Sequence, residues 1–245
     1  MKLLTLPLLV LLGLTTCLQA QTPTAPTPRT FRVMTNVGSI EELKFDTSGR
    51  KTITLNIRSQ LSNPILIPDA QPLVLYREIP PPPDSPPNTP PKKETMATVS
   101  FPKTMNQSIV VIAATSPTTY GAVVFDDSLE FHPANTLKIF NLSGMTAALK
   151  TKKDTQSISP GQTSVIPYPP GPTSIQVAVQ RGSSWALALD EGRISRRNLR
   201  GHIFVFNYQH DPSLHDGGPP PPALVRFYIE GTPEQPAQGV SVTAR

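Results

Sequence analysis

Cysteine is almost absent from this sequence: the only one among 245 residues is Cys17. A disulfide within the chain is therefore excluded, and so is a thiol nucleophile if the first twenty residues are removed. Charged residues make up only 16% of the chain, against 38% apolar residues. This balance argues against intrinsic disorder, which combines few hydrophobic residues with many like charges. The sequence also lacks a sustained helical pattern and a phosphate-binding glycine loop.

The one long apolar run lies at the N-terminus. A basic start at Met1-Lys2 precedes the apolar residues 3–14, and small residues lead to Ala20. This order is typical of a secretory signal peptide, and the run is too short for a spanning helix. We therefore predict a signal peptide at 1–20, a Thr/Pro-rich linker at 21–30 and a periplasmic or secreted location in a bacterial envelope. The segment before Cys17 also resembles a lipobox, although Thr16 departs from it, so lipidation of Cys17 is the alternative.

Short segments with alternating apolar and polar residues follow the linker. In Thr52–Arg58, Ile53, Leu55 and Ile57 point one way and polar residues the other. About ten further segments read as strands, and two of them, Ile109–Ala114 and Ile203–Tyr208, are apolar on both faces, as in central strands. Ala147–Lys150 is too short to count as a helix. The sequence predicts an all-β protein.

Two parts of the chain weakly repeat each other. The segment from Phe31 resembles the one from Leu137, 106 residues later, and the segment from Ser108 resembles the one from His202, 94 residues later. A shift near one hundred residues is the length of a seven-stranded sandwich. We therefore expect two tandem immunoglobulin-like β-sandwich domains, at 31–134 and 135–231. One larger two-sheet β-sandwich is the alternative.

The 30 prolines gather in runs that mark loops. Residues 79–94 form a proline-rich loop, expected to be polyproline II or disordered, because proline cannot donate to a sheet. Residues 216–223 form a second such interruption before the last strand. The tail at 232–245 is expected to be flexible.

A histidine–aspartate pair occurs twice in one loop, as His210-Asp211 and His215-Asp216. Imidazole and carboxylate groups are zinc, manganese or iron ligands, so these four residues are the candidate metal site and the centre of a possible metal-dependent enzyme. A polar hairpin loop explains the same residues without a metal.

The two other histidines are His132 and His202, and we interpret them as strand-edge residues. Paired carboxylates occur at Asp126-Asp127, with Glu130, and at Asp190-Glu191. Such pairs suit acid–base chemistry or calcium, but acidic residues are also favoured in turns, which is the preferred interpretation.

Four aromatic side chains could stack on sugar rings if they were exposed together: Trp185, Tyr168, Tyr208 and Tyr228. A single tryptophan in a β-protein more often lies in the core or at its edge.

The net charge of +5 is spread along the chain, with two small basic clusters. They consist of Lys150, Lys152 and Lys153, and of Arg193, Arg196, Arg197 and Arg200. Anionic lipid headgroups or acidic polymers could bind there, whereas a solvated strand face explains both without a ligand. Nucleic acid is not expected as a partner of an exported protein.

Residues 136–208 resemble uncharacterised exported bacterial β-sandwich proteins, through NTLKIFNLSG, SPGQTSVIPYPPG, SSWALALDEGRIS and RRNLRGHIFVF. The resemblance implies a fold and an exported location, and no activity. Leu75–Pro81 is also similar to the domain-closing strand of periplasmic pilus chaperones, but it comes at about half the expected distance from the mature start. That likeness is architectural only.

These observations favour an exported cell-envelope protein that is a non-catalytic binding or structural module and needs no cofactor. A free sheet edge could accept a strand from an envelope protein. No transmembrane segment is expected in the mature chain. A lipid anchor is possible if Cys17 is lipidated. The alternatives are the metal-dependent enzyme and a carbohydrate-binding module.

Overall fold

The computed structural model describes residues 28–49, 51–68, 71–115, 119–208 and 220–232. Within these ranges the protein contains sixteen strands and no helix. The strands form four sheets of four strands each. The all-β prediction is therefore confirmed, and four sheets are consistent with two tandem β-sandwiches.

The N-terminal half supplies β1 (Thr30–Thr35), β2 (Ser39–Asp46), β3 (Thr52–Arg58), β4 (Ile65–Leu66), β5 (Leu73–Ile79), β6 (Lys92–Val99), β7 (Gln107–Ala114) and β8 (Tyr120–Asp126). The C-terminal half supplies β9 (Thr136–Leu142), β10 (Ala147–Lys150), β11 (Thr155–Ile158), β12 (Thr163–Pro167), β13 (Gly171–Arg181), β14 (Ser184–Ser195), β15 (Leu199–Phe206) and β16 (Leu224–Gly231).

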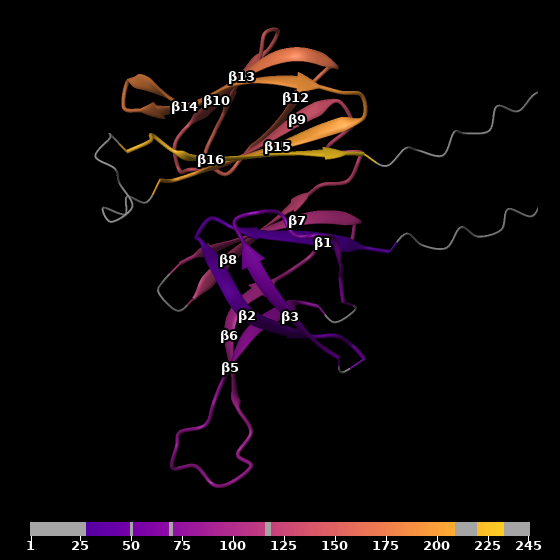
Figure 1. The fold of residues 1–245 in the computed structure, drawn as a ribbon, viewed down its shortest axis with the longest axis vertical. Helices are drawn as coiled ribbons and strands as arrows, with labels where there is room; N and C mark the ends of the chain where they lie inside the picture. Colours follow the sequence, from indigo (N-terminus) through magenta and orange to yellow (C-terminus); the bar gives the residue numbers. More distant parts are fainter. Residues whose placement is uncertain (1–27, 50, 69–70, 116–118, 209–219, 233–245) are drawn as a thin grey trace, which may run out of the picture.

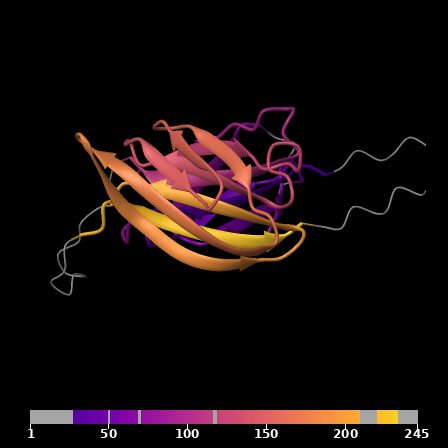
Figure 2. The same ribbon diagram turned by 90° about the horizontal axis from the view of Figure 1, so that it is seen from above.

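The sheets are stacked as four layers (Figure 1). We name them, from the bottom of the figure, the outer N sheet (β3-β2-β5-β6), the inner N sheet (β4-β1-β7-β8), the inner C sheet (β12-β9-β15-β16) and the outer C sheet (β11-β10-β13-β14). Figure 2 looks down this stack, with the C-terminal sandwich in front. The two inner sheets face each other.

The two halves repeat one topology. Adding eight to each strand number of the N-terminal sheets produces the order of the C-terminal sheets. The parallel pair β1–β7 thereby corresponds to the parallel pair β9–β15. The similar sequences found at Phe31 and Leu137 lie on β1 and β9, which are equivalent strands. The sequence repeat therefore has a structural counterpart.

Alternation along the inner strands sends side chains into two different cores. In β15, Ile203 and Val205 enter the core of the C-terminal sandwich, whereas Phe204 and Phe206 face the N-terminal sandwich. The prediction that this strand and β7 are buried on both faces is confirmed. The physical reason is that each inner sheet is covered by another sheet on both of its faces.

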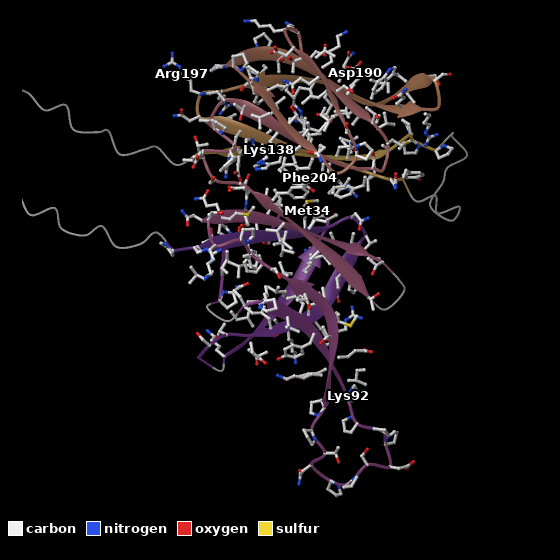
Figure 3. The ribbon with its side chains drawn as sticks, turned by 180° about the vertical axis from the view of Figure 1, so that it is seen from behind. Met34, Lys92, Lys138, Asp190, Arg197 and Phe204 are labelled. Atoms are coloured by element: carbon white, nitrogen blue, oxygen red, sulfur yellow. The ribbon has the colours of Figure 1, made fainter. Side chains whose placement is uncertain are left out.

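A third apolar layer consequently joins the sandwiches. Its fully buried members are Met34, Ile109, Val111, Phe140, Phe204 and Phe206. The Phe140 and Phe204 rings are stacked with their centroids 4.5 Å apart, and Figure 3 labels Met34 and Phe204 on the two sides of this layer. Because this contact is apolar and continuous, it resembles a domain core more than a transient contact.

Some boundaries differ from the sequence prediction. β6 begins at Lys92, so the connection between β5 and β6 is shorter than the expected loop at 79–94. This connection projects from the body (Figure 1) and contains two tight turns, closed by hydrogen bonds from Ser85 N to Pro82 O and from Thr89 N to Pro86 O. Ala147–Lys150, which is too short to count as a helix, forms the strand β10, and Ser39–Asp46 forms a strand that the sequence pattern does not predict.

Candidate functional site

A layer of charged side chains continues the apolar contact between the sandwiches. It comes from both halves of the chain and from the segment that connects them. We call it the joint cluster; its members are Arg32 on β1, Asp127 and His132 in the connecting segment, Arg200 and His202 on β15, and Glu230 on β16.

The alternation of the strands explains how charged residues reach this layer. In β1, Phe31 and Val33 enter the N-terminal core, so Arg32 points the other way, toward the C-terminal sandwich. In β15, Arg200 and His202 lie on the same face as Phe204. The polar and apolar parts of the contact thus occupy alternate positions along the same strands, on one face of each strand.

Asp127 is the centre of the joint cluster. Its Oδ1 lies 2.9 Å from His202 Nε2 and 3.1 Å from His132 Nδ1. Its Oδ2 lies 3.2 Å from Arg200 Nη2 and also accepts a hydrogen bond from Arg32 Nη2. One carboxylate therefore contacts two imidazoles and two guanidinium groups.

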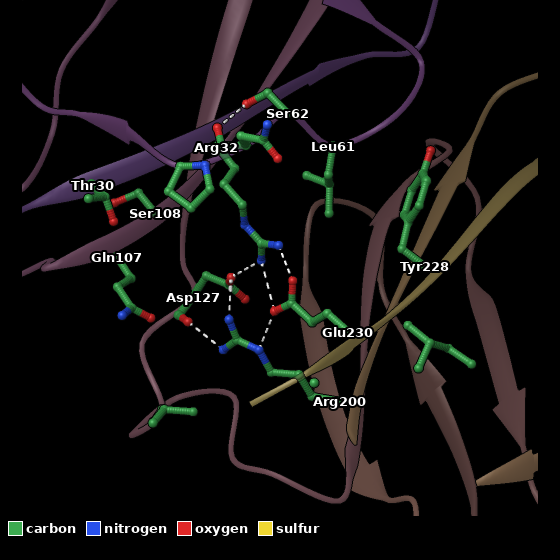
Figure 4. A pocket seen from close by; sticks show the side chains of 15 residues that line it. Thr30, Arg32, Leu61, Ser62, Gln107, Ser108, Asp127, Arg200, Tyr228 and Glu230 are labelled. Carbon is green, nitrogen blue, oxygen red and sulfur yellow. Dashed lines mark hydrogen bonds and ion pairs between the residues drawn. The ribbon is translucent and has the colours of Figure 1, made fainter. Parts of the chain in front are cut away.

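Glu230 completes the charge balance (Figure 4). Its carboxylate accepts hydrogen bonds from the guanidinium groups of both Arg32 and Arg200. Arg200 also donates from Nη1 to the main-chain oxygen of Asp127 at 2.8 Å. Two cations and two anions are thus mutually paired, which is the condition under which buried charges are tolerated.

Burial and pairing shift the titration of these groups. Burial lowers the pKa of His132 to about 4, although its hydrogen bond to Asp127 acts in the opposite direction. Burial likewise lowers the pKa of His202. Burial alone would raise the pKa of Asp127, but its hydrogen bonds from the two histidines and the charge of Arg200 bring it well below its usual range. At neutral pH the histidines are therefore neutral and the aspartate is ionised.

Asp127, His132 and His202 are also close enough to ligate a metal ion, with one candidate ligand atom of each within 4.8 Å of the others. Both ring N–H groups already point at Asp127, and the opposite nitrogens, His132 Nε2 and His202 Nδ1, are buried without a protein partner. A metal on the Asp127 side would leave those nitrogens as unsatisfied N–H donors, whereas metal-bound histidines normally donate that hydrogen to an acceptor. The hydrogen bonding therefore favours an ion-pair cluster over a metal centre.

A cleft of about 460 Å³ opens beside the cluster (Figure 4). Arg32, Asp127, Arg200 and Glu230 line it together with neutral polar residues such as Ser62 and Gln107. Every charged group in its lining is paired with another one, so the cleft offers a ligand no unpaired charge. We assign the joint cluster a structural role, holding the two sandwiches together.

Several sequence interpretations are corrected here. His132 and His202 are not strand-edge residues: both are fully buried, and β15 lies between β9 and β16. Arg200 is not on a solvated face but is buried. Asp126 has the expected turn role, because its Oδ1 accepts a hydrogen bond from Ser128 N. Asp127 does not have this role. Tertiary contacts between sandwiches, which local patterns do not report, produce all of these differences.

Asp190, which is exposed, and Glu191, which is half-buried, are engaged separately. Asp190 accepts a hydrogen bond from Gln176 at 3.1 Å, and Glu191 forms an ion pair with Arg193. The candidate metal residues His210, Asp211, His215 and Asp216 lie outside the described residues, as do Cys17 and the segment 1–20. The metal site and the signal peptide therefore stay predictions.

The four aromatic residues do not form one platform. Tyr168 is buried in the C-terminal core, Tyr228 borders the layer between the sandwiches, and Tyr208 is half-buried beyond the end of β15. Trp185 was expected in the core or at its edge; it is not a core residue, because 49% of its surface is exposed.

Trp185 stands beside a groove on the outer C sheet, which we call the β14 groove. It measures about 370 Å³ and is lined by Ala148, Lys150, Thr155, Gln156, Ser157, Gln176, Ala178, Trp185 and Leu187. Leu187, opposite Ala178 in the sheet register, is 54% exposed. Small side chains at Ala148 and Ala178 next to two large exposed ones create the hollow. Two neighbouring exposed apolar side chains beside a groove make it a candidate contact site.

β14 also lies at the edge of its sheet, where β13 is its one partner among the described strands. It has twelve residues, so its unpaired side presents a long row of backbone donors and acceptors. A free edge of this length is a template for pairing with another strand.

No protein-family model matches the chain, and no match was found among the curated proteins. In the described ranges, no helix is long and apolar enough to cross a membrane.

One signal in the sequence could have located the joint cluster. Arg32 and His202 each stand among apolar residues in strands that are buried on both faces. A charged or polar residue in such a strand must find a partner, because burying it alone is costly.

Proposed function

We propose that this chain is an exported, non-catalytic binding module of the bacterial cell envelope, which takes up an extended segment of a partner protein along β14. The observation that carries this proposal is the coincidence of a free strand edge with the exposed side chains of Trp185 and Leu187. Strand addition combines main-chain hydrogen bonds for affinity with side-chain pockets for specificity. The β14 groove is the pocket.

The part of β14 that would pair lies near its start. Farther along, Asp190, Glu191 and Arg193 carry charge, and the β13–β14 register shifts between Val177 and Ala178. Charges and bulges are the devices that protect sheet edges from pairing. Residues 184–187 carry no charge and precede the register shift, whose extra residue on β14 is Ala188, and the exposed side chains of Trp185 and Leu187 are there.

The rest of the architecture supports a binding role. The joint cluster and the third apolar layer hold the sandwiches against each other. A partner bound at β14 would consequently meet a preorganised surface, which lowers the entropic cost of binding.

In-cell photo-cross-linking tests the proposal. A photoreactive residue at position 187 should capture one protein partner, identified by mass spectrometry. The same residue at Thr98, exposed on the edge strand β6 of the other sandwich, is the matched control. Equal capture at both positions, or none at position 187, would contradict strand addition at β14.

Carbohydrate binding is the second candidate, favoured by the exposed Trp185 ring next to a groove. Aromatic rings stack on the apolar faces of sugars, and Lys150 and Gln176 could supply hydrogen bonds. A glycan array separates the candidates: glycan binding that is lost in Trp185→Ala but kept in Leu187→Lys would favour carbohydrate.

A further inference from the structure

Two basic segments that are separate in the sequence meet at one end of the outer C sheet. Lys152 and Lys153 lie in the turn between β10 and β11, and Arg196 and Arg197 follow β14. We call the surface formed by these four residues and Ile194 the basic end; Figure 3 labels Arg197 at this margin of the upper sandwich.

Lys152 connects the two segments. It lines one hollow together with Lys153 and Pro172, and a second one together with Arg193 and Ile194. Pro172 on β13 lies directly opposite Ile194 on β14 and belongs to both hollows. The turn after β10 therefore reaches the end of β14, although more than forty residues separate them in the chain.

The charge of the basic end is not neutralised locally. All four basic side chains are exposed, and none of them forms an ion pair with another described residue. The two acidic neighbours are Asp154, half-buried in the turn, and Glu191, which is paired with Arg193. The basic end is thus a positive surface that complements an anionic one.

Ile194 decides which anionic surface fits. It is 78% exposed, a larger fraction than for any other large apolar side chain in the described ranges. An acidic polymer in water would gain little from an exposed aliphatic residue. A bilayer can bury it at the headgroup–acyl boundary while its anionic headgroups attract the surrounding lysines and arginines.

We propose that the basic end binds the surface of an anionic lipid bilayer, with Ile194 inserted between headgroups held by Lys152, Lys153, Arg196 and Arg197. This proposal does not rest on strand addition at β14. The contact is peripheral, and it depends on salt because its electrostatic part is screened by ions.

Vesicle co-sedimentation of the chain lacking residues 1–20 tests the proposal. Binding is expected to vesicles of phosphatidylcholine mixed with phosphatidylglycerol, and it should weaken as salt is raised. Lys152→Gln with Lys153→Gln should lower the partition coefficient on the order of 30-fold, since each basic residue near an anionic surface contributes roughly a factor of five. Ile194→Ser should lower it by about tenfold.

The matched control is Lys51→Gln with Lys103→Gln, which removes the same charge from exposed positions on the N-terminal sandwich. This variant should bind vesicles almost as the unchanged chain does. Equal losses in the two double variants would overturn the proposal, because they would indicate attraction by net charge alone. Binding that ignores phosphatidylglycerol, or that Ile194→Ser leaves intact, would overturn it as well.

Discussion

Arg200 holds Asp127 from two directions. Its Nη1 donates to the Asp127 main-chain oxygen at 2.8 Å, and its Nη2 lies 3.2 Å from Oδ2 of the same residue. Arg200 belongs to the C-terminal sandwich, whereas Asp127 follows the last strand of the N-terminal one. The orientation of the sandwiches is therefore linked to one buried ion pair at the point where the chain passes between them.

Asp127→Asn should destabilise the protein strongly. The change keeps the side-chain shape but leaves the buried guanidinium groups of Arg32 and Arg200 with Glu230 as their one anion. Removing one partner of a buried ion pair costs about 3–5 kcal/mol. Urea denaturation measures the loss, with Asp190→Asn at an exposed position as the control. A loss below about 1 kcal/mol would contradict the central role of Asp127.

The protein should lose stability in mild acid. Burial lowers the pKa of His132 to about 4 in the folded state, whereas an unfolded histidine has a pKa near 6.5. The unfolded chain therefore binds protons first, and the free energy of unfolding falls as pH drops from about 6.5 toward 4, by up to about 3 kcal/mol for this residue. His202, whose pKa is also lowered, adds to the effect in the same direction.

Thermal unfolding between pH 7.5 and 4.5 checks this prediction. His132→Gln with His202→Gln should flatten the dependence of Tm on pH, even if the double variant is less stable at pH 7.5. An unchanged slope would show that other groups cause the acid sensitivity.

Phe204→Ala should weaken the contact between the sandwiches. The ring stacks on Phe140 and is fully buried, so its removal leaves a cavity that costs about 3–5 kcal/mol. Calorimetry should show a lower Tm and a tendency toward two transitions, because the sandwiches become less coupled. Phe131→Ala removes an equal ring that is 54% exposed and should change Tm little. Similar losses in both variants would contradict the assignment.

Gly201→Ala should destabilise the C-terminal sandwich by overpacking. A Cβ at this position would lie 2.4 Å from Leu137 Cδ2 and 3.0 Å from the Phe227 ring. Forcing the buried Leu137 and the half-buried Phe227 side chains apart costs about 1–3 kcal/mol. Gly192→Ala is the control, since nothing lies within 4 Å of its added Cβ. Denaturation midpoints of the two variants should differ clearly, and equal midpoints would contradict this close packing.

Local patterns predicted much of the fold. Alternation identified strands such as Thr52–Arg58, and double-sided apolar segments identified the central strands β7 and β15. Short or charged strands such as β2 and β10 were missed, because their apolar positions are too few for alternation to stand out.

The site was far less predictable. Trp185 was expected in the core or at its edge, and it stands beside the β14 groove because β14 lies at a sheet edge, with its outer face uncovered. Whether a strand lies at the edge or in the centre of a sheet depends on its pairing with strands that are distant in sequence, which a local pattern does not report.

The sequence by itself determined that this protein is built from strands, because the period-two pattern of apolar residues decides which segments can form sheets with a buried face. Only the tertiary structure decided that Arg32, Asp127, His202 and Glu230 meet, and that Lys152 lines one hollow with Arg193 and Ile194. The physical reason is the distance along the chain over which each effect acts. Alternation is a local property of a strand, whereas charge pairing and exposure depend on which distant strands pack together.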